Sequence, residues 1–141
     1  MKTSRLYATT ILTFSFLFIL WSCSNQYSQS KNISKASVYP AALERAMKNK
    51  RYFVMKSGIN LYTVTSIDLD KAKQQMTVTL DKLDSLHLAY FNNPQIRSNA
   101  NAQGKPLQPE IHVYMKDSIS YTLDEPHTIP VEKVARIELL D

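Results

Sequence analysis

An apolar run close to the first residue limits what the rest of the chain can fold into. Lys2 and Arg5 are followed by residues 6–20, which carry no charge and are rich in Ile, Leu and Phe. A basic start followed by an apolar run too short for a comfortable bilayer span is typical of a secretory signal that is removed. We therefore expect residues 1–22 to contribute nothing to the fold. Without them the 141-residue chain keeps 119 residues, which is enough for one domain and not for two.

The apolar run ends in Leu20, Trp21, Ser22 and Cys23. These four residues resemble the lipobox of bacterial lipoproteins, in which a branched apolar residue and a small residue precede the cysteine that is modified. The resemblance implies that a signal peptidase recognises Leu20, Trp21 and Ser22, and that Cys23 becomes a diacylglyceryl cysteine with fatty acyl chains such as palmitate. Trp21 departs from the pattern, because that position usually holds a smaller residue. Several acyl chains on one residue would hold the protein on a membrane almost irreversibly.

Cys23 is also the only cysteine in the sequence. Its modification would leave the mature protein without a free thiol. We therefore expect no intramolecular disulfide, no thiolate catalysis and no cysteine metal site. An incidental cysteine in a signal peptide, or an uncleaved membrane anchor, is the alternative interpretation.

Basic residues gather around a predicted helix at residues 40–49, where Pro40 suits the first turn and the residues that follow are good helix formers. The formal net charge is +5, but secretion separates the protein from nucleic acid, so we expect no nucleic-acid partner. The cations at the helix end are Arg45, Lys48, Lys50 and Arg51. A favourable interaction with the helix dipole explains them, and a patch for an anionic envelope ligand is the alternative.

The chain between Cys23 and this helix is polar. Residues 24–37 contain no acidic side chain and have few apolar ones beyond Tyr27 and Ile33. This composition is typical of a flexible linker. We therefore predict a signal peptide over 1–22, the lipidated cysteine and its tether over 23–38, and a single small β-rich domain over 39–141.

From residue 51 onward, apolar and polar residues alternate. A period of two predicts strands that bury one face, at residues 52–56, 59–67, 76–81, 111–115 and 119–123. Residues 128–140 are predicted to form a short strand, one helical turn and a closing strand. The expected fold is mainly β (α+β), a small antiparallel sheet or partly closed barrel of five to six strands with one short N-terminal helix. The last two dozen residues resemble the end of small SH3-like or Sm-like barrels, and closure would remove unpaired edges. An open meander packed on the helix is the alternative.

Residues 83–109 interrupt this alternation. They contain Asn92, Asn93 and Pro94 in succession, and then a polar run followed by Gly104 and prolines. We predict a short helical turn around 83–90 and a long loop after it. Loops of this length in compact domains are commonly functional or disordered.

No spacing in the sequence indicates catalysis. His87, His112 and His127 are the only histidines, and no His-x-x-x-His pair occurs, so we expect no metal site. Nucleophile-elbow and phosphate-loop motifs are also missing from the sequence. We therefore expect no catalytic residue and no cofactor, and rank an enzyme that uses His87 or His112 last.

Aromatic residues offer a candidate interaction surface. His112 and Tyr114 lie on the face of their predicted strand opposite Ile111 and Val113. Together with Tyr62 and Tyr52 they would form an exposed aromatic patch of the kind that is enriched at protein interfaces. The alternative is that a helix or loop covers this face.

The Ser-Cys-Ser junction, polar tether and small β-domain resemble the many small lipoproteins of Bacteroidota envelopes. The resemblance implies an outer-membrane anchor facing the periplasm, because serine follows Cys23 and the tether lacks an acidic run. We predict a non-enzymatic interaction or accessory subunit that holds another envelope protein at the membrane. A binding module for a small or anionic envelope ligand is the alternative.

Overall fold

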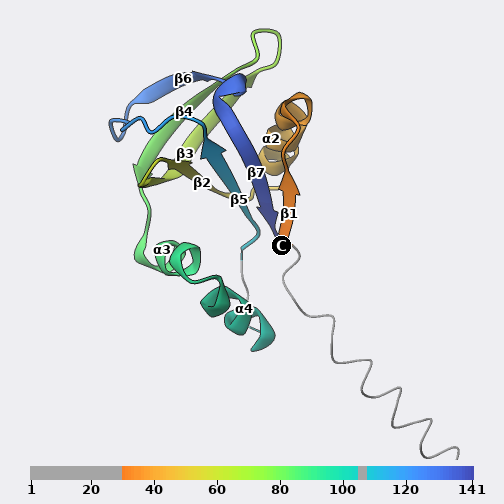
Figure 1. The fold of residues 1–141 in the computed structure, drawn as a ribbon, viewed down its shortest axis with the longest axis vertical. Coiled ribbons are helices and arrows are strands. Elements are labelled where there is room, and N and C mark those ends of the chain that lie inside the picture. Colours follow the sequence, from red (N-terminus) through yellow and green to blue (C-terminus); the bar gives the residue numbers. More distant parts are fainter. Residues whose placement is uncertain (1–29, 105–107) are drawn as a thin grey trace, which may run out of the picture.

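The computed structural model of the protein describes residues 30–104 and 108–141. Within them the chain forms an α+β fold with one seven-stranded mixed sheet and three α-helices (Figure 1). The strands are β1 (Ser30–Ile33), β2 (Tyr52–Ser57), β3 (Asn60–Asp70), β4 (Gln75–Lys82), β5 (Glu110–Met115), β6 (Pro126–Pro130) and β7 (Val134–Leu140). The helices are α2 (Tyr39–Lys48), α3 (Ser85–Asn92) and α4 (Pro94–Ala102), with short 3-10 helices η1 (Ala36–Val38) and η2 (Val131–Lys133). The predicted signal peptide and the lipobox residues Leu20, Trp21, Ser22 and Cys23 lie outside the described residues.

The sheet is open, with β1 and β6 at its edges and the strand order β1-β7-β5-β2-β3-β4-β6. β2 and β5 are parallel, and the other neighbouring pairs are antiparallel. The α+β class is confirmed. The expected number of five to six strands is wrong, the expected antiparallel pairing is wrong for β2 and β5, and the partly closed barrel is wrong because the sheet is open. Parallel neighbours need a long crossover, and β3, β4, α3 and α4 together connect β2 to β5.

Residues 30–38, which we expected in the tether, belong to the folded domain. Ser30–Ile33 pairs with Ile137 to Leu140 of β7, and η1 leads from there into α2. Most side chains of β1 are exposed. An exposed strand needs few apolar residues, so its sequence resembles that of a linker. Backbone hydrogen bonds to the neighbouring strand hold it, and such bonds leave no mark on apolar periodicity.

Residues 119–123 form a loop where we predicted a strand. Their alternation has another cause, because Tyr121 packs on the core while Ile119 and Leu123 are exposed. The edge position beside β4 is taken by β6 instead. The prediction of a strand at 119–123 is therefore wrong.

Three α-helices form where we predicted one helix and a helical turn around 83–90. The strand, helical turn and closing strand predicted over 128–140 are confirmed as β6, η2 and β7. The helix expected over 40–49 is confirmed as α2. The predicted long loop after residue 90 is wrong, because residues 94–102 form α4. Asp84 caps α3 by accepting a hydrogen bond from the His87 backbone N–H at 2.9 Å, and Pro94 starts α4. No helix among the described residues is long and apolar enough to cross a membrane.

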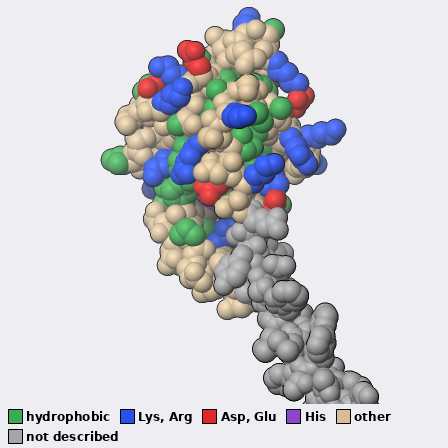
Figure 2. Space-filling view, turned by 45° about the vertical axis from the view of Figure 1, so that its right-hand side comes forward, with side chains coloured by type: hydrophobic (Ala, Val, Ile, Leu, Met, Phe, Trp, Pro, Cys, Tyr) green, Lys and Arg blue, Asp and Glu red, His purple; other side chains and the backbone are tan. Residues whose placement is uncertain are grey.

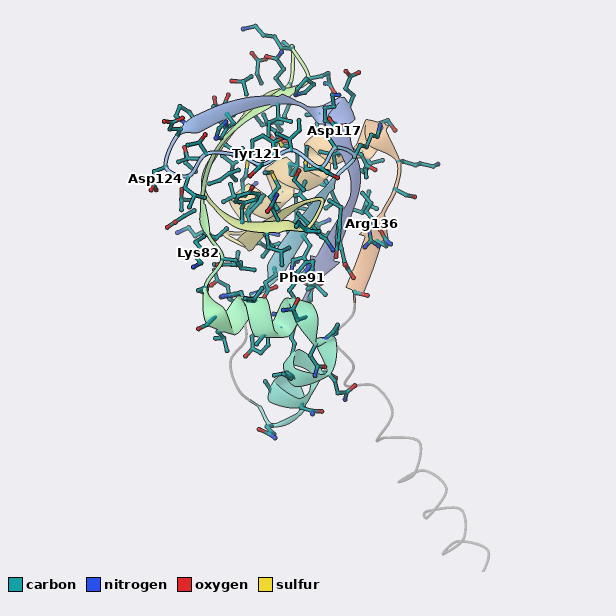
Figure 3. All side chains as sticks on the ribbon, turned by 60° about the vertical axis from the view of Figure 1, so that its left-hand side comes forward. Lys82, Phe91, Asp117, Tyr121, Asp124 and Arg136 are labelled. Atoms are coloured by element: carbon teal, nitrogen blue, oxygen red, sulfur yellow. The ribbon has the colours of Figure 1, made fainter. Side chains whose placement is uncertain are left out.

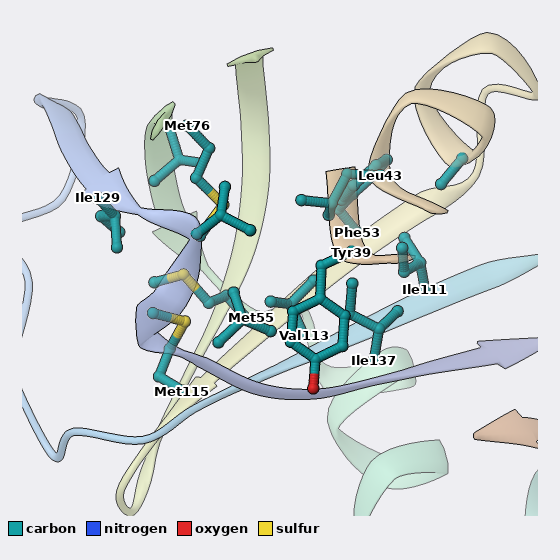
Figure 4. Packing of buried hydrophobic residues seen from close by; sticks show 14 of the residues in the cluster. Tyr39, Leu43, Phe53, Met55, Met76, Ile111, Val113, Met115, Ile129 and Ile137 are labelled. Carbon is teal, nitrogen blue, oxygen red and sulfur yellow. The ribbon is translucent and has the colours of Figure 1, made fainter. Parts of the chain in front are cut away.

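The main core lies between α2 and one face of the sheet (Figure 4). Leu43 of α2 packs there with strand residues such as Phe53, Ile111 and Ile137, all of them buried. The Tyr39 hydroxyl points toward β7 and donates a 2.6 Å hydrogen bond to the Ala135 carbonyl, since a buried hydroxyl needs a partner. Helices α3 and α4 pack on the opposite face of the sheet.

Candidate functional site

The sheet face beneath α3 and α4 carries polar residues. Tyr52, Glu110, Leu140 and Ser30 are paired in register across four strands, so their side chains share this face. His112 and Glu138 follow in the next row on the same face. Phe91 projects from α3 toward the sheet (Figure 3), and its ring centroid lies 5.1 Å from that of His112. Alternation along β5 therefore sends apolar side chains to the core and polar ones beneath the two helices.

Glu110 is the centre of the polar cluster, with only 1% of its surface exposed. One carboxylate oxygen accepts a hydrogen bond from Arg97 of α4, and the other accepts one from His112 Nε2 at 2.7 Å. His87 Nε2 lies 3.7 Å from the first oxygen. Residues from α3, α4 and β5 thus converge on one carboxylate, which a buried charge requires.

Arg97 supplies the opposite charge and is 4% exposed. Besides Glu110, it donates from Nη2 to the Gln108 carbonyl at 3.2 Å. Its Nε is buried without a hydrogen-bond partner among the described residues, which lowers stability. The ion pair fastens α4 to the start of β5.

Asp84 organises the start of α3. Besides capping the helix, its carboxylate accepts hydrogen bonds from His87 Nδ1 at 2.6 Å and from the Tyr52 hydroxyl at 2.8 Å. The rings of Tyr52 and His87 are stacked with centroids 3.7 Å apart. Burial raises the pKa of Asp84, but hydrogen bonds from His87 and Tyr52 outweigh it and lower the pKa to about 2. Burial, with a contribution from the Asp84 carboxylate, raises the pKa of Tyr52 to about 12.

Replacing Asp84 by Ala should destabilise the domain by about 1–2 kcal/mol at neutral pH, because a helix cap and two side-chain hydrogen bonds are lost. The folded pKa of about 2 lies below the ordinary value of 3.8. The contribution is therefore complete above the ordinary value and declines as the pH falls toward 2. The Asp84 side chain is 49% exposed, and solvent screening keeps this contribution modest.

Urea unfolding of both proteins at neutral pH and near the folded pKa of Asp84 measures this effect. The difference in unfolding free energy should shrink at the acidic pH. An equal difference at both values would contradict a role for the Asp84 charge.

A pocket of about 200 Å³ lies beside the polar cluster, between β5, β7 and the two helices. Its lining comprises Ser30, Tyr90, Phe91, Pro94, Arg97, Glu110, His112, Tyr114, Glu138 and Leu140. Glu138 accepts a 3.0 Å hydrogen bond from the Tyr114 hydroxyl, and the Arg136 guanidinium lies 3.9 Å from the Tyr114 ring centroid. Burial and the Glu138 charge raise the pKa of Tyr114 to about 12. Tyr114 therefore interacts with both Glu138 and Arg136 at this side of the pocket.

The carboxylates of Glu110 and Asp84 are hydrogen-bonded to neighbouring groups. Both oxygens of Glu110 are occupied, and both Asp84 oxygens accept hydrogen bonds. Among the described residues no group of three or more His, Cys, Asp or Glu side chains is placed to hold a metal ion. His127 lies apart from this site and contacts the Thr122 carbonyl at 2.8 Å.

The four residues of the predicted aromatic patch do not form one surface, although Tyr52 shares a sheet face with His112 and Tyr114. Tyr62 is buried in the main core, where its hydroxyl accepts a 3.0 Å hydrogen bond from the Tyr121 backbone N–H. His112 is buried and Tyr114 half-buried on the other face, beneath Phe91. The interpretation in which a helix covers His112 and Tyr114 therefore matches the structure.

Lys and Arg side chains are scattered over the face of the molecule that Figure 2 shows. Arg45, Lys48 and Lys50 are exposed, whereas Arg51 is paired with Asp141 and donates to the Leu140 carbonyl at 3.0 Å. A second pocket, of about 330 Å³, lies between α2 and the β1–β7 edge and has Lys31, Arg45 and Arg51 in its lining. Arg51 thus makes contacts that stabilise the fold, and Arg45 and Arg51 both line a pocket.

Sequence reasoning missed Glu110, Arg97, Asp84 and their convergence. Two signals were present. Arg97 is the only Lys, Arg, Asp or Glu between residues 85 and 102, and Glu110 alternates with His112 on one strand face. Neither signal says which residues pair, because the contact between Arg97 and Glu110 depends on how α4 crosses the sheet.

Comparison with known proteins found no matching family model, no matching curated protein and no matching solved structure.

Proposed function

We propose that this chain is a lipoprotein anchored through Cys23 in the outer membrane and facing the periplasm, where it acts as a non-enzymatic interaction or accessory subunit. Residues 1–23 support the anchor through their resemblance to a lipoprotein signal. An exposed apolar tip at the far end of the sheet supports the interaction role.

The apolar tip consists of Ile59 and Ile119, which are 95% and 48% exposed. Ile59 lies in the turn between β2 and β3. The loop that carries Ile119 is fixed to this turn, because the Ser57 hydroxyl lies 2.9 Å and 2.7 Å from the carbonyls of Asp117 and Ile119. Large apolar side chains on a fixed backbone can enter a partner's pocket with little loss of conformational entropy.

The tip faces away from the predicted anchor. Ser30 is in register with Tyr52 through β7 and β5, whereas Ile59 follows the opposite end of β2. Six strand residues separate these ends by roughly 17 Å. A domain held by the residues before Ser30 would therefore present Ile59 to proteins beyond the membrane surface.

Photocrosslinking in cells tests the tip. With benzoylphenylalanine at position 119, we expect one discrete adduct with an envelope protein. Adding Ile59→Asp should reduce the adduct by about tenfold or more, because a charge would replace an apolar anchor. Ala72→Asp, in the exposed turn between β3 and β4, is the matched control and should leave the adduct unchanged. Absence of an adduct, or an adduct insensitive to Ile59→Asp, would contradict the proposal.

The second candidate function is binding of an anionic envelope ligand, which the pocket lined by Lys31, Arg45 and Arg51 favours. Thermal stabilisation by lipopolysaccharide fragments that is lost in Arg45→Gln would favour this function over the first.

A further inference from the structure

We propose that α3 and α4 contact the same bilayer that holds the lipid anchor, with Leu86, Leu88 and Ile96 in its headgroup and acyl boundary. This inference rests on the proposed lipidation of Cys23 and adds a second, non-covalent membrane contact. The segment 85–102 is called the helical lobe below.

The outer side of the helical lobe exposes three large apolar side chains among polar but uncharged residues such as Asn92 and Gln95. Leu86, Leu88 and Ile96 are 55%, 38% and 44% exposed, although surface helices of soluble domains usually turn polar residues outward. In α3, His87 and Phe91 occupy the side toward the sheet, and the two leucines flank that side. The helix therefore exposes apolar surface that the domain itself does not cover.

The helical lobe also lacks exposed formal charge. Charged residues make up 21% of the chain, yet residues 85–102 contain only Arg97. That side chain is directed inward and paired with Glu110. An uncharged outer surface suits the acyl boundary, because moving a charge into hydrocarbon is costly.

The lobe lies at the end of the domain where the anchor must be. Ser30 lines the same pocket as Tyr90 and Pro94, and Figure 1 shows α3 and α4 together on the side where β1 starts and β7 ends. Six residues separate Cys23 from Ser30. Even a fully extended chain of that length spans only about 25 Å. A lipid on Cys23 would thus keep the bilayer within reach of the lobe.

Cations near this end complement anionic headgroups. Lys31 follows Ser30 in β1, and Lys48 and Lys50 lie at the end of α2 just before β2 begins. All three are exposed. A lysine close to an anionic membrane raises affinity by roughly fivefold. Charge complementarity therefore favours an anionic bilayer over an uncharged protein face as the occupant.

Site-specific fluorescence on the mature full-length protein tests the contact. Because Cys23 would be acylated and is the only native cysteine, an introduced cysteine is the only reactive thiol. Leu88→Cys and Ile96→Cys are labelled with a polarity-sensitive nitrobenzoxadiazole dye and reconstituted into vesicles of phosphatidylethanolamine and phosphatidylglycerol. Ile59→Cys and Ala72→Cys, both away from the lobe, are the matched controls.

Dyes at positions 88 and 96 should show blue-shifted emission and quenching by headgroup spin-labelled lipid, while dyes at 59 and 72 stay in water. Aqueous emission at 88 and 96, in protein that sediments with the vesicles, would overturn the inference even though the anchor itself held.

An absent lipid anchor is detected separately, by mass spectrometry of the intact protein. If intact mass shows no lipid on Cys23, the proposed function fails, and the same labels on a Cys23→Ala chain that begins at residue 23, mixed with the same vesicles, decide the contact alone. A blue shift at position 88 would then support it, and no shift would overturn it. Leu86→Asp with Leu88→Asp should weaken vesicle binding of that unlipidated chain about a hundredfold, roughly tenfold for each leucine.

Discussion

Replacing Glu110 by Gln is expected to lower the free energy of unfolding by about 3–5 kcal/mol, because Arg97 would keep a buried charge without its partner. Glu110 is almost fully buried and receives hydrogen bonds from both Arg97 and His112. Glutamine offers one carbonyl oxygen in place of two charged ones, so His112 also loses an acceptor. Urea unfolding followed by circular dichroism measures the change.

Glu138→Gln is the matched control for this prediction. Glu138 lies beside His112 on the same sheet face and accepts one hydrogen bond from Tyr114, but it is only partly buried. Its replacement should reduce stability by only about 1 kcal/mol. Adding Arg97→Met to Glu110→Gln should restore part of the lost stability, because the uncompensated charge disappears. Equal effects of the two glutamine substitutions would show that the buried ion pair does not hold α4 on the sheet.

Cys23→Ala is expected to abolish membrane attachment and to leave the protein soluble or unprocessed. Without a thiol at position 23 no diacylglyceryl group can be added. The lost binding energy is large, since each buried methylene of an acyl chain contributes about 0.8 kcal/mol. Fractionation of cells into membrane and soluble material, with immunodetection, measures the effect.

Ser24→Ala is the control for this second substitution, because it alters the neighbouring residue and keeps the thiol. It should stay in the membrane fraction. Incorporation of labelled fatty acid into the Cys23→Ala protein would contradict lipidation at this residue.

Local signals account for the parts of the fold that could be predicted. Alternating side chains marked β3, β4 and β5, and Pro40 with the residues after it marked α2. β1 could not be predicted, because an edge strand with exposed side chains has no apolar period. The parallel pairing of β2 with β5 could not be predicted, because strand direction depends on the long connection between them. The loop at 119–123 was predicted as a strand because apolar residues alternate with polar ones there, but Tyr121 alone packs inward.

The candidate site was harder to predict than the fold. Tyr62 and Tyr114 looked alike in the sequence, yet pleating of different strands sends them to opposite faces of the sheet. Burial of Glu110 is favourable only because α4 brings Arg97 over it. That long-range contact is set by the packing of two helices on the sheet, which apolar periodicity does not describe.

The central proposal, a lipid-anchored subunit, is tested most directly by the intact mass of the mature protein extracted from membranes. We predict a chain that begins at Cys23 and carries a diacylglyceryl group with a further amide-linked acyl chain. A protein that retains residues 1–22, or one with an unmodified Cys23, would contradict the proposal.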